Sequence, residues 1–290
     1  MNVRNFLLIF NKEKYISFFL IFPSLFLVLI TYLYPAIITF TISFAEFDLI
    51  NLGIKKFVKF KNYQYLFNNN LFISSVLRTI YFGFLICIIT TIFSFLIALL
   101  LNENFIGKYL LRVVIVLPWA IPSVVSGVLW GQMFHADTGF LNALLFNLGF
   151  ITSYKIWLAD PIVSLHIIAV AEIWKAIPFM TLFFLSGLQS LPSEAFEAAS
   201  VDGANIFQKF YHILVPLMIP IAIPLFFIQF VLAMKSFDTI FVLTRGGPGG
   251  GTTTLNYYIY QEAFEAFNFG RASAAAYSLL LITVAVVLIP

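Results

Sequence analysis

Four charged side chains lie within or at the end of two long apolar runs, where charge is unusual. Glu172 and Lys175 are three residues apart, and Lys235 and Asp238 repeat this spacing further along the chain. Residues three apart on a helix share a face, so each pair is placed to form an ion pair that lowers the cost of burying charge. The alternative is that these groups handle a polar solute, an ion or a proton. Pro178 favours the alternative, because its missing N–H predicts a local opening of the helix near Lys175.

Residues 193–212 form a polar interruption between two apolar runs and carry the signals of two short helices. Ser193 is expected to cap the first helix, and Gly203 is suited to the left-handed backbone conformation that ends it. Asn205 and Gln208 have the spacing of a capping pair that begins a second helix. The segment therefore predicts a helix, a sharp bend and a second helix.

The side chains of the first of these helices suit contact with another protein. Ala198 and Ala199 are small enough to let the backbone of a partner approach closely, and the adjacent Glu197 is available to pair with a basic group on that partner. A docking element is the interpretation we favour. The alternative is an amphipathic helix that lies at the membrane interface and joins two spans.

The remaining chemical motifs are weaker. The glycine-rich stretch 246–251 has no Lys-Ser or Lys-Thr after it, so it predicts a flexible external turn and not a phosphate cradle. Gly127 and Gly131 have the four-residue spacing of a motif that lets two helices pack closely. The partner helix belongs either to the same bundle or to a second copy of the chain in a homodimer. Cys87, the single cysteine, excludes an internal disulfide and is expected to be a small buried hydrophobe. The three histidines have no second ligand at metal spacing, so no metal site is expected.

The composition identifies the class of protein that must position these groups. Of 290 residues, 61% are hydrophobic and only 10% are charged, whereas soluble domains are about one-quarter charged. The chain is therefore an integral membrane protein. Its formal net charge of +3, without a long basic run, gives no indication of nucleic-acid binding.

Six apolar runs are long enough to cross the hydrocarbon core of a bilayer as helices. The first is too long for a perpendicular span, so it is expected to tilt, with kinks at Pro23 and Pro35. The runs lie near residues 16–44, 72–101, 110–134, 162–188, 213–234 and 271–290. They predict an all-α transmembrane protein.

The basic residues leave the orientation of these spans open. Arg4, Lys12 and Lys14 precede the first span and favour a cytoplasmic amino terminus. Four lysines nevertheless crowd residues 55–61, in a loop that alternation of the spans would place outside the cell.

The spacing within the polar segment resembles a family signature. An EAA triplet at residues 197–199 is followed after three residues by Gly203, and after nine more by ILVP at residues 213–216. This is similar to the EAA signature of the membrane subunits of bacterial ATP-driven (ABC) importers, with Val215 where the pattern has leucine. The resemblance implies a type I ABC importer fold, a single permease domain over residues 1–290, and a cytoplasmic coupling helix that docks on the ATPase. The implied ATPase-coupling residues are Glu197, Ala198, Ala199, Gly203 and Pro216.

Three further fragments are similar to the carbohydrate-importer branch of this family, which includes the larger maltose permease and the glycerol-phosphate permeases. They are FKNYQYLF at residues 60–67, LPWAIPSVVSGVLWGQMF at residues 117–134 and FDTIFVLTRGGPGG at residues 237–250. Because they occur in the expected order around the EAA segment, the resemblance covers nearly the whole chain. In the maltose permease, residues of the two corresponding runs hold the sugar. The positions carried over to this chain are Lys175, Phe179, Gln229, Ser236 and Asp238, which supply the aromatic and hydrogen-bonding groups that a sugar needs.

The resemblance implies a permease subunit through which a sugar or related polyol crosses the plasma membrane, driven by ATP hydrolysis on separate subunits. Its implied partners are a second, related permease that completes a heterodimer, two ATPase subunits that dock on the EAA segment, and an extracytoplasmic solute-binding protein. With six spans, a cytoplasmic EAA segment places both termini in the cytoplasm. No catalytic set, cofactor or nucleic-acid partner is expected. The alternative is an ion-coupled secondary transporter or channel, in which Glu172, Lys175 and Asp238 would couple ions or protons.

Overall fold

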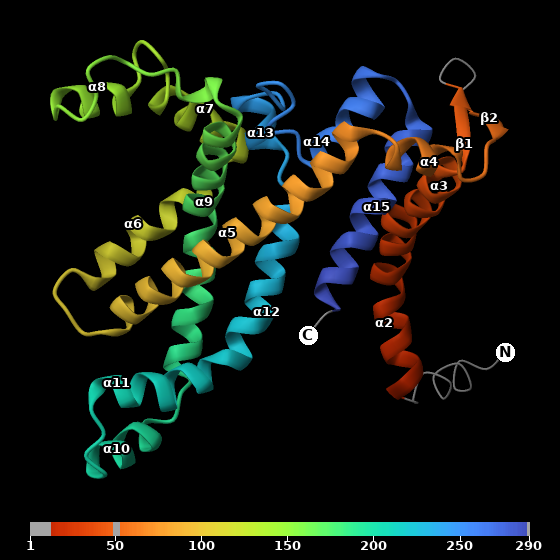
Figure 1. The fold of residues 1–290 in the computed structure, drawn as a ribbon. Coiled ribbons are helices and arrows are strands. Elements are labelled where there is room, and N and C mark those ends of the chain that lie inside the picture. Colours follow the sequence, from red (N-terminus) through yellow and green to blue (C-terminus); the bar gives the residue numbers. More distant parts are fainter. Residues whose placement is uncertain (1–12, 49–52, 289–290) are drawn as a thin grey trace. The chain divides into compact units, whose positions relative to one another are not determined.

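The computed structural model describes residues 13–48 and 53–288, and most of these residues are helical (Figure 1). Arg4 and Lys12, whose charges bear on the orientation of the chain, lie outside the described residues. Contacts between residues group the chain into two compact units. The first combines the amino-terminal part of the chain with a later segment, residues 261–278, and the second contains the remainder.

Five described helical segments are long and apolar enough to cross a membrane, and a bent pair of helices makes a sixth if it is counted as one span. The five segments are Ser17–Ser43, Asn70–Asn102, Pro161–Gln189, Ile206–Leu243 and Phe269–Val287. Each corresponds to one predicted apolar run. The all-α membrane fold is therefore confirmed.

The predicted run 110–134 differs from the others, because it is not one straight helix. It consists of α6 (Lys108–Ala120) and α7 (Ser123–Met133), which meet at an angle of 100°. Pro122 follows α6 and restricts the residue before it to an extended conformation, which Ile121 adopts with ψ of 126°. The span therefore breaks at Ile121, because Pro122 prevents the helix from continuing there.

The first unit, formed by residues 1–68 and 261–278, begins with the first predicted span. Helix α2 (Glu13–Val28) continues through Pro23, where a kink is predicted, without interruption of the helix. The helix then passes through a π-helical turn, η1 (Leu29–Leu33), into α3 (Tyr34–Ser43), which has Pro35 at its start. The kink predicted at Pro35 stays a prediction, but a wider turn precedes this residue, in which the Tyr34 N–H donates to the Leu29 carbonyl five residues back.

A small hairpin follows α3 in the first unit, and the sequence did not indicate it. Strands β1 (Ala45–Asp48) and β2 (Gly53–Phe57) pair antiparallel, and α4 (Lys61–Phe67) follows them. The Asn62 amide, at the start of α4, donates to the carbonyls of Ser43 and Ala45 at 2.9 and 3.1 Å. These two bonds join the start of α4 to the end of α3 and to the first residue of β1.

The later part of the first unit contains the π-helical turn η4 (Gln261–Glu265) and the start of α15 (Phe269–Val287). Gly270 lies so close to the Ala45 carbonyl that an added Cβ would collide with the oxygen. Further along the same helix, the Tyr277 hydroxyl donates to the Ala36 carbonyl at 2.6 Å. The hydroxyl bond joins α15 to α3, and the glycine contact joins it to the start of the hairpin.

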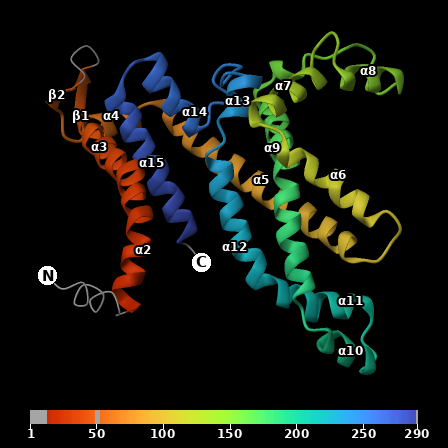
Figure 2. The same ribbon diagram turned by 180° about the vertical axis from the view of Figure 1, so that it is seen from behind.

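The second unit, formed by residues 69–260 and 279–290, is built on three long helices. They are α5 (Asn70–Asn102), α9 (Pro161–Gln189) and α12 (Val215–Met234), and α9 packs against both of the others (Figures 1 and 2). Gly187 of α9 permits a close approach to α12, because an added Cβ would lie 2.7 Å from the side chain of Ile221. Helix α9 continues through Pro178, so the opening predicted there is wrong.

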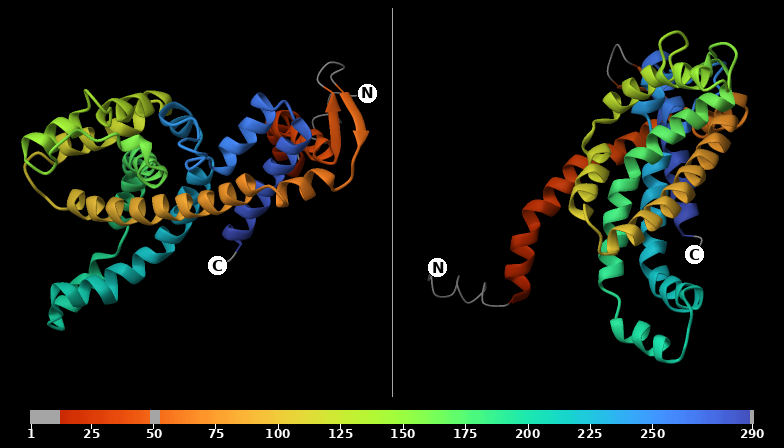
Figure 3. Two further views of the ribbon diagram at one scale, coloured as in Figure 1. Left: turned by 45° about the horizontal axis from the view of Figure 1, so that its top comes forward. Right: turned by 90° about the vertical axis from the view of Figure 1, so that its left-hand side faces the viewer.

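Shorter helices complete one end of the second unit. Helices α8 (Phe140–Asn147), α13 (Asp238–Leu243) and α14 (Leu255–Tyr260) lie at the end of α9 where α7 packs (Figure 3). Gly127 and Gly131 of α7 face Val242 and Leu243 of α13, whose side chains would lie 3.0 and 3.3 Å from a Cβ added to each glycine. The glycine pair therefore packs two helices of the same chain together, which is the interpretation of packing within the bundle.

Candidate functional site

The polar segment folds as a helix, a bend and a second helix, as predicted. Helix α10 (Ser193–Val201) begins at Ser193, one residue earlier than a serine cap requires, and its N-cap is Pro192 without a side-chain bond. The cap predicted at Ser193 is therefore wrong. At the other end, Gly203 has φ of +78°, which is the left-handed conformation expected of it.

Backbone bonds around Gly203 close the end of α10. The Gly203 N–H donates to the Ser200 carbonyl at 3.2 Å, and the Ala204 N–H donates to the Ala199 carbonyl at 2.9 Å. This pair of bonds is a Schellman motif, in which the residue after the C-cap must be left-handed. Gly203 therefore determines the direction in which the chain leaves α10.

The second helix of the segment begins with the predicted capping pair. Helix α11 (Ile206–Lys209) has a capping box in which the Asn205 N–H donates to Gln208 Oε1 at 2.8 Å and the Gln208 N–H donates to Asn205 Oδ1 at 2.9 Å. Lys209 Nζ also donates to Ser200 Oγ, 2.6 Å away. The two helices are thus joined by a side-chain bond in addition to the bend.

The segment exposes both apolar and charged groups, and we call residues 193–212 the docking element. Val201 and Ile206 are 87% and 83% exposed, and Phe207 is exposed beside them. Glu197 and Ala198 are at least partly exposed. An exposed cluster of large apolar side chains with a nearby carboxylate suits both interpretations of this segment, a surface that another protein covers and a helix at the membrane interface.

Pro216 lies where the docking element joins α12. A π-helical turn, η3 (Phe210–Leu214), precedes α12, and the Val215 N–H donates to the Phe210 carbonyl five residues back. Pro216 is the second residue of α12 and has no N–H to donate. Because Pro216 cannot donate the regular backbone bond of an α-helix, the wider turn that precedes it maintains the helix into α12.

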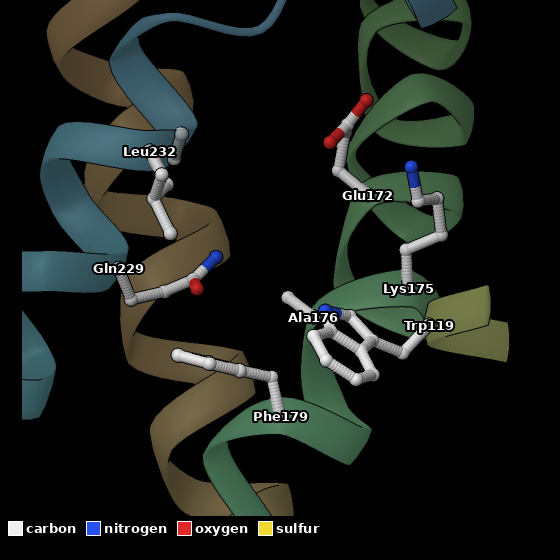
Figure 4. Close-up of a pocket in the computed structure, with 8 residues that line it drawn as sticks. Trp119, Glu172, Lys175, Ala176, Phe179, Gln229 and Leu232 are labelled. Carbon is white, nitrogen blue, oxygen red and sulfur yellow. The ribbon is translucent and has the colours of Figure 1, made fainter. Parts of the chain in front are cut away.

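A cavity of about 190 Å³ lies between α9 and α12 in the second unit (Figure 4). Three of the five predicted pathway residues line it, namely Lys175 and Phe179 from α9 and Gln229 from α12. Glu172 lines it as well, and Trp119 contributes from the end of α6. The Trp119 and Phe179 rings lie 5.9 Å apart between centroids, so the cavity has an aromatic wall next to its polar groups.

The two charged residues of this cavity bond to different helices. Lys175 Nζ donates to Ser123 Oγ at 2.5 Å, at the first residue of α7. Glu172 Oε1 accepts a hydrogen bond from the Thr239 hydroxyl in α13. Within the described chain, no ion pair joins Glu172 to Lys175. The intrahelical pair predicted as the simpler interpretation is therefore wrong, and α9 uses its polar face to hold α7 and α13.

Gln229 is the most enclosed polar group of the cavity. The residue is only 5% exposed, and in the described part of the chain its amide has no hydrogen-bond partner. Figure 4 shows the amide directed from α12 toward α9. The amide atoms of Gln229 are not among the fully enclosed polar atoms that lack a partner, so they face the open space of the cavity. A ligand with hydroxyl groups in this cavity can therefore bond to them.

The other two predicted pathway residues, Ser236 and Asp238, do not line the cavity. Ser236 is buried, and its hydroxyl has no partner among the described residues. Asp238 is exposed at the first residue of α13. In the part of the chain that the structure describes, Asp238 forms an ion pair with neither Lys235 nor Lys175.

Three contributions to the cavity were not predicted from the sequence. Trp119 lines it, and Ser123 and Thr239 hold its charged groups. Trp119 and Ser123 lie on either side of the break between α6 and α7. The prolines around that break, at positions 118 and 122, were the signal that could have indicated it.

The remaining motifs fold as local structure. The stretch 246–251 is a turn, as predicted, and its last residue, Gly251, packs against Pro161. Just after it, Arg78 Nη1 of α5 donates to the Thr253 carbonyl at 2.5 Å. Cys87 is buried, as expected. Among the described residues, no group of three or more His, Cys, Asp or Glu side chains is placed to hold a metal ion.

Apolar helices of membrane-crossing length, an exposed docking element and a polar cavity between helices define a membrane-spanning permease. Residues 90–289 match the family described as "Binding-protein-dependent transport system inner membrane component". The chain belongs to this family. Its helices have the type I ABC importer fold, because the chain superimposes with a TM-score of 0.83 on a chain of a bacterial ABC transporter involved in the import of the acidic polysaccharide alginate. That likeness covers 96% of this chain and 94% of the other at 22% identity.

Several curated relatives are similar over most of their length. The chain is 36% identical to a trehalose/maltose transport system permease protein of Thermococcus litoralis, over 89% of this chain and 85% of the relative. It is 32% identical to a sulfoquinovosyl glycerol transport system permease protein of Agrobacterium fabrum, over 91% and 85%. It is 29% identical to an sn-glycerol-3-phosphate transport system permease protein of Pectobacterium atrosepticum, over 96% and 93%.

Proposed function

We propose that the chain is a permease subunit of an ABC importer that carries a sugar or related polyol across the plasma membrane. ATP hydrolysis on separate subunits drives the transport, and the chain itself catalyses no reaction. The observation that carries this proposal is the docking element, in which Glu197 and Ala198 lie on a surface helix whose exit direction Gly203 fixes. The named functions of the curated relatives support the substrate class.

The docking element supplies the mechanical connection to the ATPase. Glu197, Ala198 and Ala199 provide the contact, Gly203 sets the bend, and Pro216 begins the helix that follows. Lys209 bonds to Ser200, and in this proposal the two short helices move together when a bound ATPase moves them. The motion enters the membrane through α12, which also carries Gln229 of the cavity.

The substrate pathway passes the cavity between α9 and α12. Lys175, Phe179 and Gln229 contact the solute in this proposal, and Ser236 and Asp238 act on the part of the pathway that lies beyond the cavity. A sugar ring has apolar faces and hydroxyl edges, so it matches an aromatic wall that is interrupted by hydrogen-bonding groups. Alternating access then exposes the cavity to each side of the membrane in turn.

Four partners complete the transporter in this proposal. A second, related permease forms a heterodimer with this chain, two ATPase subunits bind the two docking elements, and an extracytoplasmic solute-binding protein delivers the sugar. A structural relative supports the last of these partners, since it belongs to a bacterial alginate transporter in complex with an alginate pentasaccharide-bound periplasmic protein.

Two measurements test this function together. The complex is purified from native membranes through a tag on this chain, and uptake of labelled trehalose, maltose, glycerol and glycerol 3-phosphate is compared in cells with and without the gene. We expect an ATPase and a second permease to co-purify, and uptake of at least one compound to depend on the gene. Transport by this chain alone in liposomes, without ATP, would contradict the proposal and favour an ion-coupled transporter.

The topology is tested by a reporter inserted after Lys59, in the loop that follows β2. We propose that both termini are cytoplasmic, so this loop lies outside the cell. The expected readout is therefore extracytoplasmic. A cytoplasmic readout at this position would overturn the proposed orientation.

A further inference from the structure

The polar groups of the cavity include both donors and acceptors. Lys175 Nζ uses one of its hydrogens on Ser123 and retains two. Glu172 Oε1 accepts from Thr239, and among the described residues Oε2 accepts from no side chain or backbone group. The Gln229 amide adds two donor hydrogens and an acceptor oxygen. A ligand that only accepts hydrogen bonds would therefore leave Glu172 Oε2 and the Gln229 amide oxygen without a donor.

The formal charges of the cavity balance. Glu172 and Lys175 are the charged residues that line it, and they lie three residues apart on α9. An anion that entered would lose its hydration and would meet a carboxylate in the same wall as the ammonium that attracts it. A hydroxyl group both donates and accepts, so it can bond to either residue without adding charge. This wall therefore suits a neutral ligand with several hydroxyl groups.

We propose that the cavity accepts neutral sugars or polyols and excludes sugars that carry a phosphate, sulfonate or carboxylate group, with Glu172 as the residue that excludes them. This inference rests on the proposed function, because it deepens the substrate class of the same cavity. Trp119 and Phe179 supply the apolar contact for a sugar ring, and Gln229 supplies an amide that both donates and accepts hydrogen bonds. Some relatives of this chain are named for acidic substrates and others for neutral ones, so the charge of the wall decides between two classes that the family includes.

The charge selectivity of the cavity can be measured without knowledge of the substrate. Cys87 is the single cysteine, so Cys87→Ser gives a cysteine-free chain. Ala176→Cys then places one thiol on the cavity wall, while Ser153→Cys places a control thiol in an exposed loop. In the purified complex, the rates of modification by neutral, anionic and cationic methanethiosulfonate reagents are compared, and each rate at Ala176→Cys is divided by the corresponding rate at Ser153→Cys.

We expect the neutral reagent to react faster than either charged reagent at Ala176→Cys, by about tenfold. Adding Glu172→Gln leaves Lys175 unbalanced, so the anionic reagent gains about tenfold and becomes faster than the cationic one. Adding Lys175→Gln produces the opposite order. The inference is wrong if the anionic reagent is the fastest in the unaltered cavity, if neither substitution changes the order, or if the thiol reacts with none of the reagents.

Protection by sugars gives a second readout on the same protein. Trehalose, maltose and glycerol should together include at least one compound that slows the neutral reagent at Ala176→Cys, whereas glucuronate and glycerol 3-phosphate should not slow it. With Glu172→Gln, protection by an anionic compound should appear. Protection of the unaltered cavity by an anionic compound, or by no compound, would overturn the inference. The proposed function fails by a different result, namely that no ATPase co-purifies and uptake is unchanged without the gene.

Discussion

The Lys175 ammonium donates a hydrogen bond to the Ser123 hydroxyl, 2.5 Å away, and so joins the middle of α9 to the break between α6 and α7. Charge within a membrane-crossing helix is expensive unless polar groups surround it. Ser123 supplies one such group, and the cavity supplies the others. The bond therefore gives Lys175 a local partner on α7.

Lys175→Met retains the length of the side chain but removes its charge. We expect uptake to fall about tenfold, because a hydrogen bond to a charged group contributes about 1.5–3 kcal/mol, while the transporter still assembles and retains basal ATPase activity. The control is Lys155→Met, which removes an exposed lysine that lies over the Trp157 ring and should leave uptake unchanged.

Asp238→Ala should also lower uptake, and the structure indicates that its effect is independent of Lys175. Lys175 bonds to Ser123 and not to Asp238. Removing both charges should therefore not restore the uptake that each single substitution lowers. Assembly of the complex and uptake are measured in the two single variants and in the double variant. Full recovery in the double variant would mean that the two residues form a structural pair and do not handle substrate.

Glu197→Lys reverses a charge on the surface of α10. We expect the helices to fold normally, but less ATPase to co-purify and uptake to fall by about tenfold, because the new lysine repels the basic group that Glu197 contacts in the proposed interface. Glu194→Lys is the matched control, since it reverses another glutamate of the same helix. Equal ATPase recovery in the two variants would remove the reason to place the contact at Glu197.

Gly203→Val tests the bend of the docking element. No atom lies within 4 Å of the position of an added Cβ, so the cost of valine comes from the backbone, which it strains by about 1–2 kcal/mol at positive φ. Gly149 provides a matched control, because its φ of +75° and its open surroundings are nearly the same. We expect Gly203→Val to weaken ATPase recovery and Gly149→Val to leave it normal. If the two variants behave alike, the bend has no special role in docking.

Pro216→Ala supplies the N–H that proline lacks and so favours a regular α-helix in place of the π-helical turn η3. Uptake should fall several-fold although the ATPase still binds, because the docking element then connects differently to α12. Pro35→Ala is the comparison, since Pro35 also follows a π-helical turn at the second position of a helix. Normal uptake with Pro216→Ala would show that the wider turn does not affect transport.

The features that depend on local chemistry could be predicted from the sequence. Hydrophobic runs identified the spans, the capping box of Asn205 and Gln208 formed as its spacing indicated, and Gly203 took the left-handed conformation. In each case the determining interactions occur within a few residues of the chain. The all-α membrane fold followed for the same reason.

The features that depend on contacts between distant residues could not be predicted. The spacing of Glu172 and Lys175 indicated an ion pair, but Thr239 lies 67 residues from one and Ser123 lies 52 residues from the other. The hairpin of β1 and β2 was missed because its strands have four and five residues. Nor did the glycines of 246–251 indicate that Arg78, far earlier in the chain, holds the following turn.

The π-helical turn η3 sets the rotation of α12 relative to the docking element, and so it bears on the cavity. Each residue of an α-helix advances the rotation by about 100°, and a π-helical turn holds about one residue more than a regular turn does. If η3 became regular α-helix while the docking element stayed in place, α12 would rotate by about one residue. Ile228, now about half exposed, would then take the direction that Gln229 has. An aliphatic side chain would replace the amide, so the polarity of the cavity depends on a turn about four helical turns away from it.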